Sequence, residues 1–600
     1  MNNSALKYHP LQDSEIRLIT IKPAPRNHPI ECRLENIRLS KECQFIALSY
    51  VWGNPKDLLP IIVNDVSFTV TRNLYHALCQ LREWVAEGSE VFENYFSSSG
   101  QYFFWADAIC LNQDDDNEKT QQIPRMRDVY GTAVLVCGWL GLPKEGKENM
   151  IDKIFTMGRK LAAEPFRKAD GNIYLYTGMM LALGDELPAF SKTFAEVIDL
   201  PWFTRVWILQ EFVLPRACPL LVLGRYYCPF IGIASIYASL TFKRHNDLFD
   251  FDDRTDQVLR STTTLIGMEL LREWHTEHLR TPLYTSGENH LPAFAQRLGQ
   301  VLSRKSPFHR STLPHDGIYG VLGMAQAPDL PLALKPDYNK PYSLVCQDYA
   351  RFLIENIGDL TILSGSGERF ENENLSIPSW VPDFNWLDSR FEGARPRINS
   401  PITFSSDGKR MTVEGISLGK CVKVFQAESS CWSAFEKLEK EVLVPASTLR
   451  SCSPDLLLNE WLDTWIRPYF TISITALRKH YDVRMKGKPL VVHSLEDILA
   501  FEDQKGQVSQ LMSSILVQLV HEYVLLSENG SIGILLNCSK MPFVDDLLCI
   551  FKGMKTISVL RPYGSSYKFI GICQPHCRLS SEEFDDVFFS CREVQKFVLS

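Results

Sequence analysis

The 600-residue sequence contains no long hydrophobic run and no tract of positive charge. Its most apolar stretches, such as 134–142 and 515–526, are shorter than the roughly 20 residues of a membrane-spanning helix or are interrupted by polar residues. Lys and Arg number 63 against 71 Asp and Glu, and we find no basic patch of the kind that nucleic-acid-binding proteins carry. We therefore expect neither a membrane span nor a nucleic-acid partner.

The chain also lacks a disulfide framework and an export signal. Its 16 cysteines are spread without paired spacing, and the first 15 residues have neither the basic start nor the apolar core of a signal peptide. These features predict reduced thiols and a cytoplasmic location. Cys573, His576, Cys577 and Cys591 have side chains that suit zinc, but their spacing matches no usual site, so we expect no metal.

The length of the chain predicts at least two domains, because a single core stops growing well below 600 residues. Hydrophobic residues make up 45% and charged residues 22%, which is typical of a folded protein. We find no tandem repeat and no low-complexity tract. The pattern indicates an N-terminal extension at 1–42, an α/β domain at 43–240, a helical connector at 241–355 and a mixed α/β C-terminal domain at 356–600.

The α/β domain is indicated by apolar runs that alternate with segments of helical periodicity. A hairpin is expected over 60–70, with its turn at Asn64-Asp65. This alternation predicts a mainly parallel sheet that helices cover on both faces. The expected strands are 44–52, 102–110, 133–141 and 220–227, and the expected helices are 72–85, 117–133 and 201–214.

Two further features concern helices. Pro124 lies inside the expected helix at 117–133, where it removes a backbone hydrogen bond and should kink or restart the helix. Beyond about residue 375 the sequence is typical of short strands with turns, interrupted by a helical block near 454–526.

Three ordered blocks carry a family resemblance: FIALSYVWG (45–53), the stretch from FWADAICLNQ to VCGWLG (104–141) and PWFTRVWILQEFVL (201–214). They resemble the signature blocks of the fungal heterokaryon incompatibility (HET) domain. Later stretches, among them HDGIYGVLGMA (315–325) and IPSWVPDFNW (377–386), are also similar to the family, so the resemblance covers most of the chain. It implies a protein of allorecognition, a form of innate immunity in which non-self recognition triggers programmed cell death.

HET domains in turn resemble TIR domains, which are flavodoxin-like signalling modules. ALSY (47–50) is similar to the first TIR strand, and WADAI (105–109) is similar to the second with its aspartate. The pair Trp207 and Glu211 resembles the Trp-x-x-x-Glu helix whose glutamate is catalytic in TIR enzymes that hydrolyse NAD. The resemblance therefore implies a candidate NAD glycohydrolase, with NAD as a substrate and no resident cofactor.

The spacing of this pair suits the chemistry. Residues four apart on a helix share one face. Cleavage of the bond between nicotinamide and ribose passes through an oxocarbenium-like state, which a nearby carboxylate stabilises. We assign Glu211 as the catalytic residue. The substrate-binding candidates are Tyr50 and Trp52 as pocket walls, Asp107 at a strand end where α/β sheets bind ligands, and Asn112, Arg205 and Trp207.

Structural roles are the alternative for each of these side chains. Trp207 can belong to the core, the face from Arg205 to Glu211 can be a polar network, and Asn112 can order its loop. The alternative function is a non-catalytic signalling and protein-interaction module. For both functions we expect an unidentified non-self or regulatory protein partner. For the enzyme, self-association of the domains is the expected switch for NAD hydrolysis. A cleft that gathers Glu211 with the ends of the first two strands favours the enzyme, whereas burial of Glu211 against Arg or backbone amides favours the module.

Overall fold

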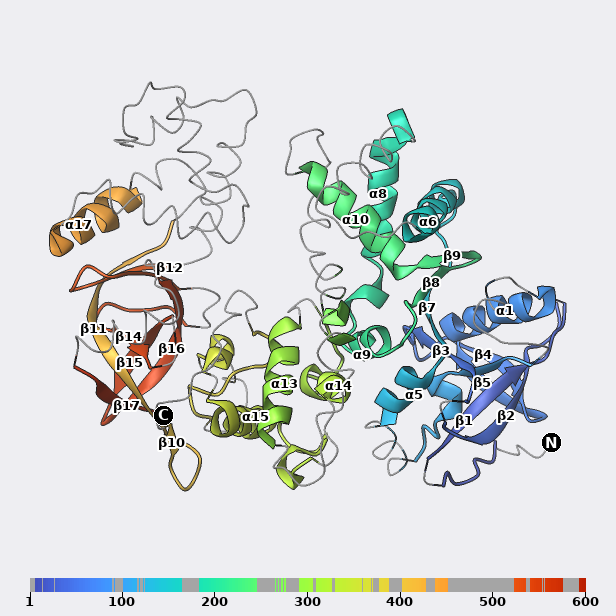
Figure 1. Ribbon diagram of the computed structural model, residues 1–600, viewed down its shortest axis with the longest axis horizontal. Coiled ribbons are helices and arrows are strands. Elements are labelled where there is room, and N and C mark those ends of the chain that lie inside the picture. The colour runs from blue at the N-terminus through green and yellow to red at the C-terminus, as the bar shows by residue number, and fades with distance from the viewer. Residues whose placement is uncertain are drawn as a thin grey trace. The chain divides into compact units, whose positions relative to one another are not determined.

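The computed structural model divides the chain into two compact units. The first comprises residues 1–288 and 308–329, and the second comprises 289–307 and 330–600 (Figure 1). The structure describes, some of them with short gaps, residues 6–91, 101–163, 183–244, 265–276, 291–387, 402–427, 437–451, 523–575 and 593–600.

A nine-stranded sheet forms the framework of the first unit, in the order β5-β4-β2-β1-β6-β3-β7-β8-β9. The neighbours β6, β3, β7 and β8 are parallel, and β2 pairs in parallel with β4, while the remaining pairings are antiparallel. The predicted α/β character is therefore confirmed, but the sheet is mixed and only its middle is continuously parallel. The strands are β1 (Glu15–Ile21), β2 (Glu31–Arg38), β3 (Phe45–Tyr50), β4 (Leu58–Val63), β5 (Val66–Thr71), β6 (Phe103–Trp105), β7 (Leu135–Gly141), β8 (Leu220–Leu223) and β9 (Tyr226–Pro229).

The N-terminal segment 1–42 contributes β1 and β2 to this sheet. β1 pairs with β6, so the segment lies directly beside the parallel strands. The predicted hairpin is confirmed as β4 and β5, and both Asn64 and Asp65 have positive φ, as a tight two-residue hairpin turn requires.

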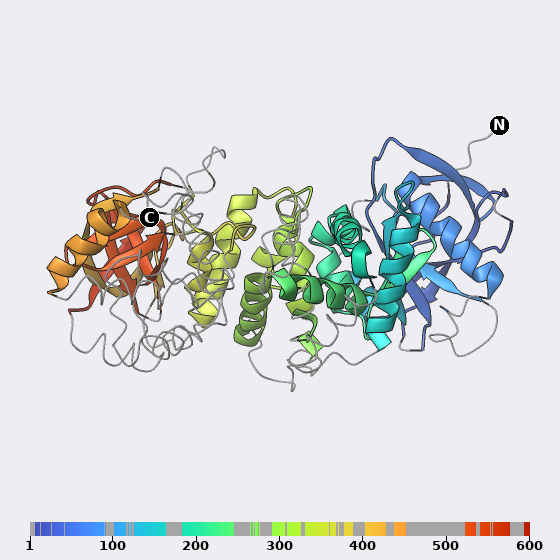
Figure 2. The ribbon, with the colours of Figure 1, turned by 90° about the horizontal axis from the view of Figure 1, so that it is seen from above.

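Helices pack around the sheet (Figure 2). Among them, α1 contacts β1, β4, β5 and β7. α6 and α10 cross where Gly158 meets Gly232, since a Cβ added at Gly232 would lie 2.2 Å from the Gly158 carbonyl oxygen. Glycine at this crossing permits contact between the two backbones. In the described part of this unit, the helices with defined bounds include α1 (Arg72–Glu87), α3 (Asp107–Cys110), α5 (Met126–Thr132), α6 (Glu148–Ala163), α8 (Leu187–Ile198), α9 (Ile208–Val213), α10 (Phe230–Arg244) and α14 (Asp316–Ala325).

Three local expectations need correction. The strand expected at 102–110 ends at Trp105, because the carbonyl of Ala106 accepts the first bonds of the short helix α3. The strand expected at 220–227 is a hairpin of two strands, which turns at Gly224 with positive φ. The helix expected at 201–214 is interrupted at Arg205, as described below. Pro124 lies outside the described residues, and α5 begins two residues after it.

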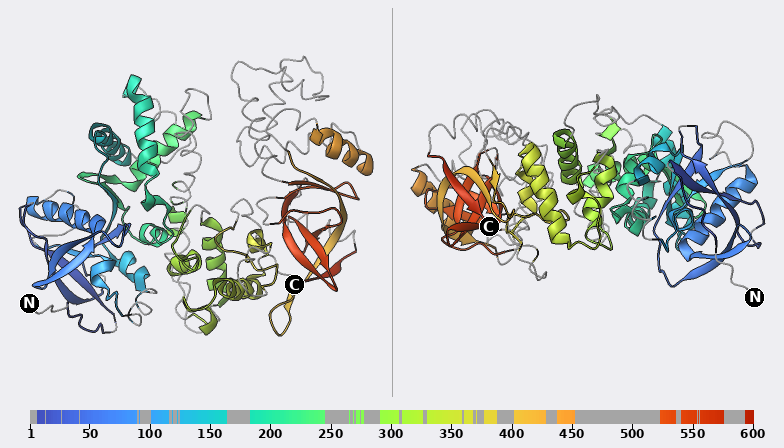
Figure 3. Two further views of the ribbon diagram at one scale, coloured as in Figure 1. Left: turned by 180° about the vertical axis from the view of Figure 1, so that it is seen from behind. Right: turned by 90° about the horizontal axis from the view of Figure 1, so that it is seen from below.

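The second unit combines helices with a mostly antiparallel sheet. α13 (Leu291–Arg304) packs against α15 (Tyr342–Ile357). β11 pairs with both β12 and β14, so six strands close into a barrel in the order β11-β12-β13-β16-β15-β14 (Figures 1 and 3). The strands are β10 (Thr403–Phe404), β11 (Met411–Phe425), β12 (Tyr523–Ser527), β13 (Ile532–Leu535), β14 (Leu547–Phe551), β15 (Ile557–Tyr563), β16 (Ser566–Pro575) and β17 (Gln595–Leu599).

Most of the helical block expected at 454–526 lies outside the described residues, and from Tyr523 onward the chain forms β12. In the described part of the chain, no helix is long and apolar enough to cross a membrane.

Candidate active site

A buried hydrogen-bond chain joins β3 to α9. Ser49, the penultimate residue of β3, donates its hydroxyl proton to the Glu211 carboxylate. The indole Nε1 of Trp202 donates to Ser49 Oγ at 2.9 Å. Ser49 is 0% exposed and Glu211 is 5% exposed, so water contributes little to this arrangement. The position of the Glu211 carboxylate is therefore set by residues of the first and third signature blocks.

Electrostatics around Glu211 favour its protonated form. Burial raises the pKa of Glu211 to about 7, and the negative charge of Asp107 adds to this effect. The positive charge of Arg205 and hydrogen bonds from Ser49 and Tyr130 act in the opposite direction on the pKa. The carboxyl group therefore changes its charge near neutral pH, which is a property of general acids and bases in active sites.

Arg205 holds the end of β3 and interrupts the expected helix. Its backbone is extended and forms an isolated bridge with Arg310, in which Val206 N donates to the Arg310 carbonyl at 3.0 Å. This pairing ends the 3₁₀ turn η3 (Pro201–Thr204), and α9 then starts at Ile208. The Arg205 guanidinium donates to the carbonyl of Tyr50. Arg205 thus contacts the backbone of β3 while its charge acts on Glu211.

Asp107 links the ends of β3 and β6. Its Oδ2 accepts a hydrogen bond of 2.8 Å from Trp52 Nε1, and the Trp52 side chain is 37% exposed. The Tyr50 side chain is buried, and burial followed by the Asp107 charge holds its pKa well above the usual range. Tyr50, Asp107, Arg205 and Glu211 thus interact within one cluster at the carboxyl ends of two parallel strands, and Trp52 joins it through Asp107.

Trp207 and Asn112 have different surroundings. Trp207 is half-buried beside Gly320 of α14, where an added Cβ would lie 3.7 Å from the indole. α14 also supports α9 directly, because Gln210 Nε2 donates to the Gly320 carbonyl at 2.8 Å. Asn112 orders its own loop: its backbone N–H donates to Glu118 Oε1 at 2.9 Å, and its side-chain oxygen accepts from Asp114 N at 3.3 Å.

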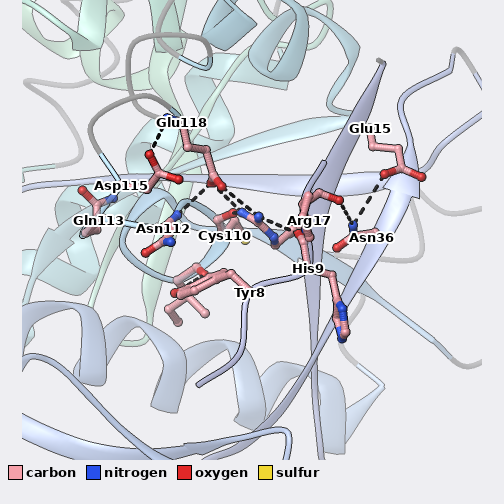
Figure 4. Close-up of polar contacts among 12 residues, drawn as sticks. Tyr8, His9, Glu15, Arg17, Asn36, Cys110, Asn112, Gln113, Asp115 and Glu118 are labelled. Carbon is pink, nitrogen blue, oxygen red and sulfur yellow. Dashed lines mark hydrogen bonds and ion pairs between the residues drawn. The ribbon is translucent and has the colours of Figure 1, made fainter. Parts of the chain in front are cut away.

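A buried ion pair that sequence reasoning missed anchors this loop (Figure 4). The Arg17 guanidinium on β1 makes two hydrogen bonds to the Glu118 carboxylate, of 2.6 and 2.9 Å. It also donates to the carbonyl of Cys110 at 3.0 Å. Arg17 is 1% exposed and Glu118 is 13% exposed. No short-range sequence pattern predicts this ion pair, because its two residues are far apart in the sequence. The ion pair nevertheless fixes the segment that follows Asp107.

A separate cleft lies between the loop that follows β3 and the start of α1. It has a volume of about 290 Å³ and is lined by Gly53, Asn54, Asp57, Arg72, Asn73, His76 and Leu142. Neither Glu211 nor the other predicted site residues belong to this lining. Sequence reasoning did not identify these residues, although Gly53 closes the first signature block. Among the described residues, no group of three or more His, Cys, Asp or Glu side chains is arranged to hold a metal ion.

Comparison with known proteins agrees with the sequence blocks. The family model for "Heterokaryon incompatibility protein (HET)" matches residues 45–211, which include both Ser49 and Glu211. The chain is also 25% identical over 430 residues, or 62% of its length, to "Heterokaryon incompatibility protein 6, OR allele" of Neurospora crassa. It spans 58% of that relative. No solved structure shows a significant match. The domain match and this relative together support a HET domain at residues 45–211, the segment that begins with the first signature block and ends within the third.

Proposed function

We propose that this protein acts in heterokaryon incompatibility, as a non-self recognition protein whose HET domain triggers cell death. Two findings support the proposal: the domain match at 45–211 and the similarity to an incompatibility protein of Neurospora crassa. Fusion of strains that differ at this gene tests it. Deleting the gene from one partner should restore growth of the fused cells. Unchanged cell death after deletion would contradict the proposal.

The chemistry that we propose for the HET domain is NAD hydrolysis in a TIR-like site. The observation that supports it is the Glu211 carboxyl group, which lies in a polar cluster at the carboxyl ends of β3 and β6 and has a pKa raised to about 7 by burial. Ionised Glu211 would stabilise the oxocarbenium-like ribose, and nicotinamide would leave as the bond breaks. Water would then take the place of nicotinamide on the ribose.

Burial of Glu211 adds a condition to this proposal. A carboxylate that is 5% exposed does not reach a substrate in the described conformation. Hydrolysis therefore requires a rearrangement that opens the contacts of α9, and self-association of the HET domain is the trigger that we propose. NAD turnover should then rise more steeply than in proportion to protein concentration.

The same burial favours a second function, a non-catalytic signalling module. Ser49, Tyr130 and Arg205 all interact favourably with the ionised Glu211 carboxylate, as expected for a structural polar network. In this case the HET domain transmits the signal by binding partner proteins, and Glu211 serves to hold α9 against β3.

An NAD assay separates the two functions. The purified full chain is incubated with NAD over a range of protein concentrations, and also after fusion to a constitutive oligomerisation domain, and released nicotinamide is measured. Glu211→Gln should lower turnover about a hundredfold, which corresponds to roughly 3 kcal/mol of lost transition-state stabilisation. Glu145→Gln, at an exposed position, is the matched control. Absence of nicotinamide in every condition supports the module, and full turnover by a stable Glu211→Gln protein removes Glu211 from the catalytic role.

A further inference from the structure

The cleft beside β3 lies where the connections of two parallel strands diverge. After β3 the chain forms β4, β5 and α1, and the next strand of the parallel set, β6, pairs with β3 on one side. β7 pairs with β3 on the other side, and β8 follows next to β7. In open α/β sheets such a switch point leaves a crevice outside the carboxyl ends of the strands, and ligands bind there. Gly53 and Asn54 follow β3 and Leu142 follows β7, so the cleft occupies this crevice.

The walls of the cleft are held in place by Asn73. Its Nδ2 donates to the Val51 carbonyl after β3 at 2.6 Å, and its Oδ1 accepts from Trp139 Nε1 of β7 at 2.9 Å. Asn73 belongs to the first turn of α1, so one amide group ties the start of this helix to both strand ends. Gly53 has a φ of +77°, a conformation that L side chains rarely adopt, and Asn73 lies against it. The cleft is therefore a preformed feature of the fold.

The groups that face the cleft are suited to an anion. Arg72, the first residue of α1, pairs with Asp57 through Nε at 2.8 Å, which leaves the two terminal nitrogens of its guanidinium to bind a ligand. No acidic residue lies in the first turn of α1, and no side chain caps its N-terminus. The positive end of the helix dipole thus acts in the same direction as Arg72.

His76 lies one turn further along α1. Burial, and after it the positive charge of Arg72, lowers the pKa of His76, while Asp57 acts in the opposite direction. The imidazole is therefore neutral at pH 7 and provides one hydrogen-bond donor without requiring a counterion. Asn54 adds an amide to the lining of the cleft.

We propose that this cleft binds a small phosphate-bearing metabolite, with the phosphate against Arg72 and the first turn of α1. The volume of about 290 Å³ lies at the lower end of small-molecule pockets and suits a single nucleoside phosphate or sugar phosphate. Asn54, His76 and Leu142 then contact the remainder of the ligand. The site goes beyond the proposed NAD hydrolysis, because none of its residues belongs to the Glu211 cluster.

Isothermal titration calorimetry of the full chain tests the site with three probes: adenosine monophosphate, ribose 5-phosphate and uncharged adenosine. None of them contains nicotinamide, so the outcome is independent of NAD hydrolysis. We expect at least one of the two phosphate-bearing probes to bind, and adenosine to bind at least tenfold more weakly than adenosine monophosphate. Absence of binding by both phosphate-bearing probes at millimolar concentration overturns the proposal.

The two partners of the Arg72–Asp57 ion pair provide matched variants. Arg72→Gln should weaken binding of the phosphate-bearing probe about tenfold or more, because it removes a charge-assisted hydrogen bond. Asp57→Asn should strengthen binding, because it removes a negative charge beside the phosphate and releases Arg72. If the ion pair is only structural, both substitutions should change the affinity for the probe in the same direction and by the same amount. That result would refute the assignment of Arg72 as a phosphate ligand.

Two further variants locate the bound probe. Leu142→Trp should block the cleft, and the fold should tolerate it because Leu142 is 55% exposed. Lys22→Gln removes a similar charge from an exposed ion pair with Glu31, and Lys22 and Glu31 are not among the cleft residues. It should leave binding unchanged. Wild-type affinity in Leu142→Trp, or an equal loss in Lys22→Gln, shows that the probe binds elsewhere and contradicts the proposal.

Discussion

Ser49 donates a hydrogen bond to the carboxylate of Glu211, although 162 positions separate the two residues in the chain. The bond connects the end of β3 to α9 and thus the first signature block to the third. Because Trp202 also donates to Ser49, the orientation of Glu211 depends on a tryptophan that neither contacts solvent nor belongs to α9. Three of the predictions below concern this connection.

The first prediction concerns stability and pH. Burial raises the pKa of Glu211 in the folded state to about 7, above the unfolded value of about 4.3. Between these two pH values the folded protein binds more protons than the unfolded protein, so protonation of Glu211 stabilises the folded state. This contribution to stability is complete below about pH 4 and is lost as the pH rises through about 7. The difference between the two pKa values corresponds to about 4 kcal/mol.

Comparison with Glu211→Gln measures this contribution. As the pH is raised from 5 to 8, the thermal midpoint of the wild-type protein should decrease relative to that of the variant, because glutamine does not titrate. Differential scanning calorimetry of both proteins across this pH range provides the measurement. Parallel pH profiles would show that the Glu211 pKa is not raised in the folded protein.

The second prediction concerns the pH dependence of NAD turnover. If the ionised Glu211 carboxylate acts on the ribose, turnover should increase with pH through about 7, the value to which burial raises the Glu211 pKa, and then level off. Ser49→Ala removes a donor to the ionised form, so the midpoint of the profile should move to higher pH. Turnover that is independent of pH between 5.5 and 8.5 would argue against Glu211 as the titrating group.

The third prediction concerns space for Trp202. A Cβ added at Gly138 of β7 would lie 2.9 Å from Cζ2 of Trp202 and 3.0 Å from Leu221. Gly138→Ala should therefore displace the buried indole from Ser49 and cost about 1–3 kcal/mol of stability. Gly131→Ala on α5 is the control, because an added Cβ there meets nothing within 4 Å. Chemical denaturation of both variants is the measurement, and equal stabilities would show that Trp202 moves without cost.

The fourth prediction concerns the Arg17–Glu118 ion pair. Arg17→Met leaves a largely buried carboxylate without its guanidinium and should cost about 3–5 kcal/mol. Lys22→Met breaks an exposed ion pair on the same strand pair and should cost less than about 1 kcal/mol. Replacing both Arg17 and Glu118 with Met should recover part of the loss. Similar stabilities of Arg17→Met and Lys22→Met would contradict a structural role for the buried pair.

Local patterns in the sequence determined many elements of this protein. The alternation around Asn64-Asp65 identified the hairpin, helical spacing identified α1, and short apolar runs identified β3 and β7. These predictions succeeded because the period of buried residues and the turn residues act over a few neighbouring positions. The signature blocks likewise indicated a HET domain, and the family model matches residues 45–211.

Other features were decided only by tertiary structure. Strand order made the sheet mixed, and pairing of Arg205 with Arg310 interrupted a stretch whose local pattern favours a helix. Ser49, Trp202, Arg17 and the cleft residue Arg72 were missed because each acquires its role from partners brought close by strand order and helix packing. Tertiary structure also decided the raised pKa of Glu211, because the loss of water around a side chain depends on every segment that packs over it.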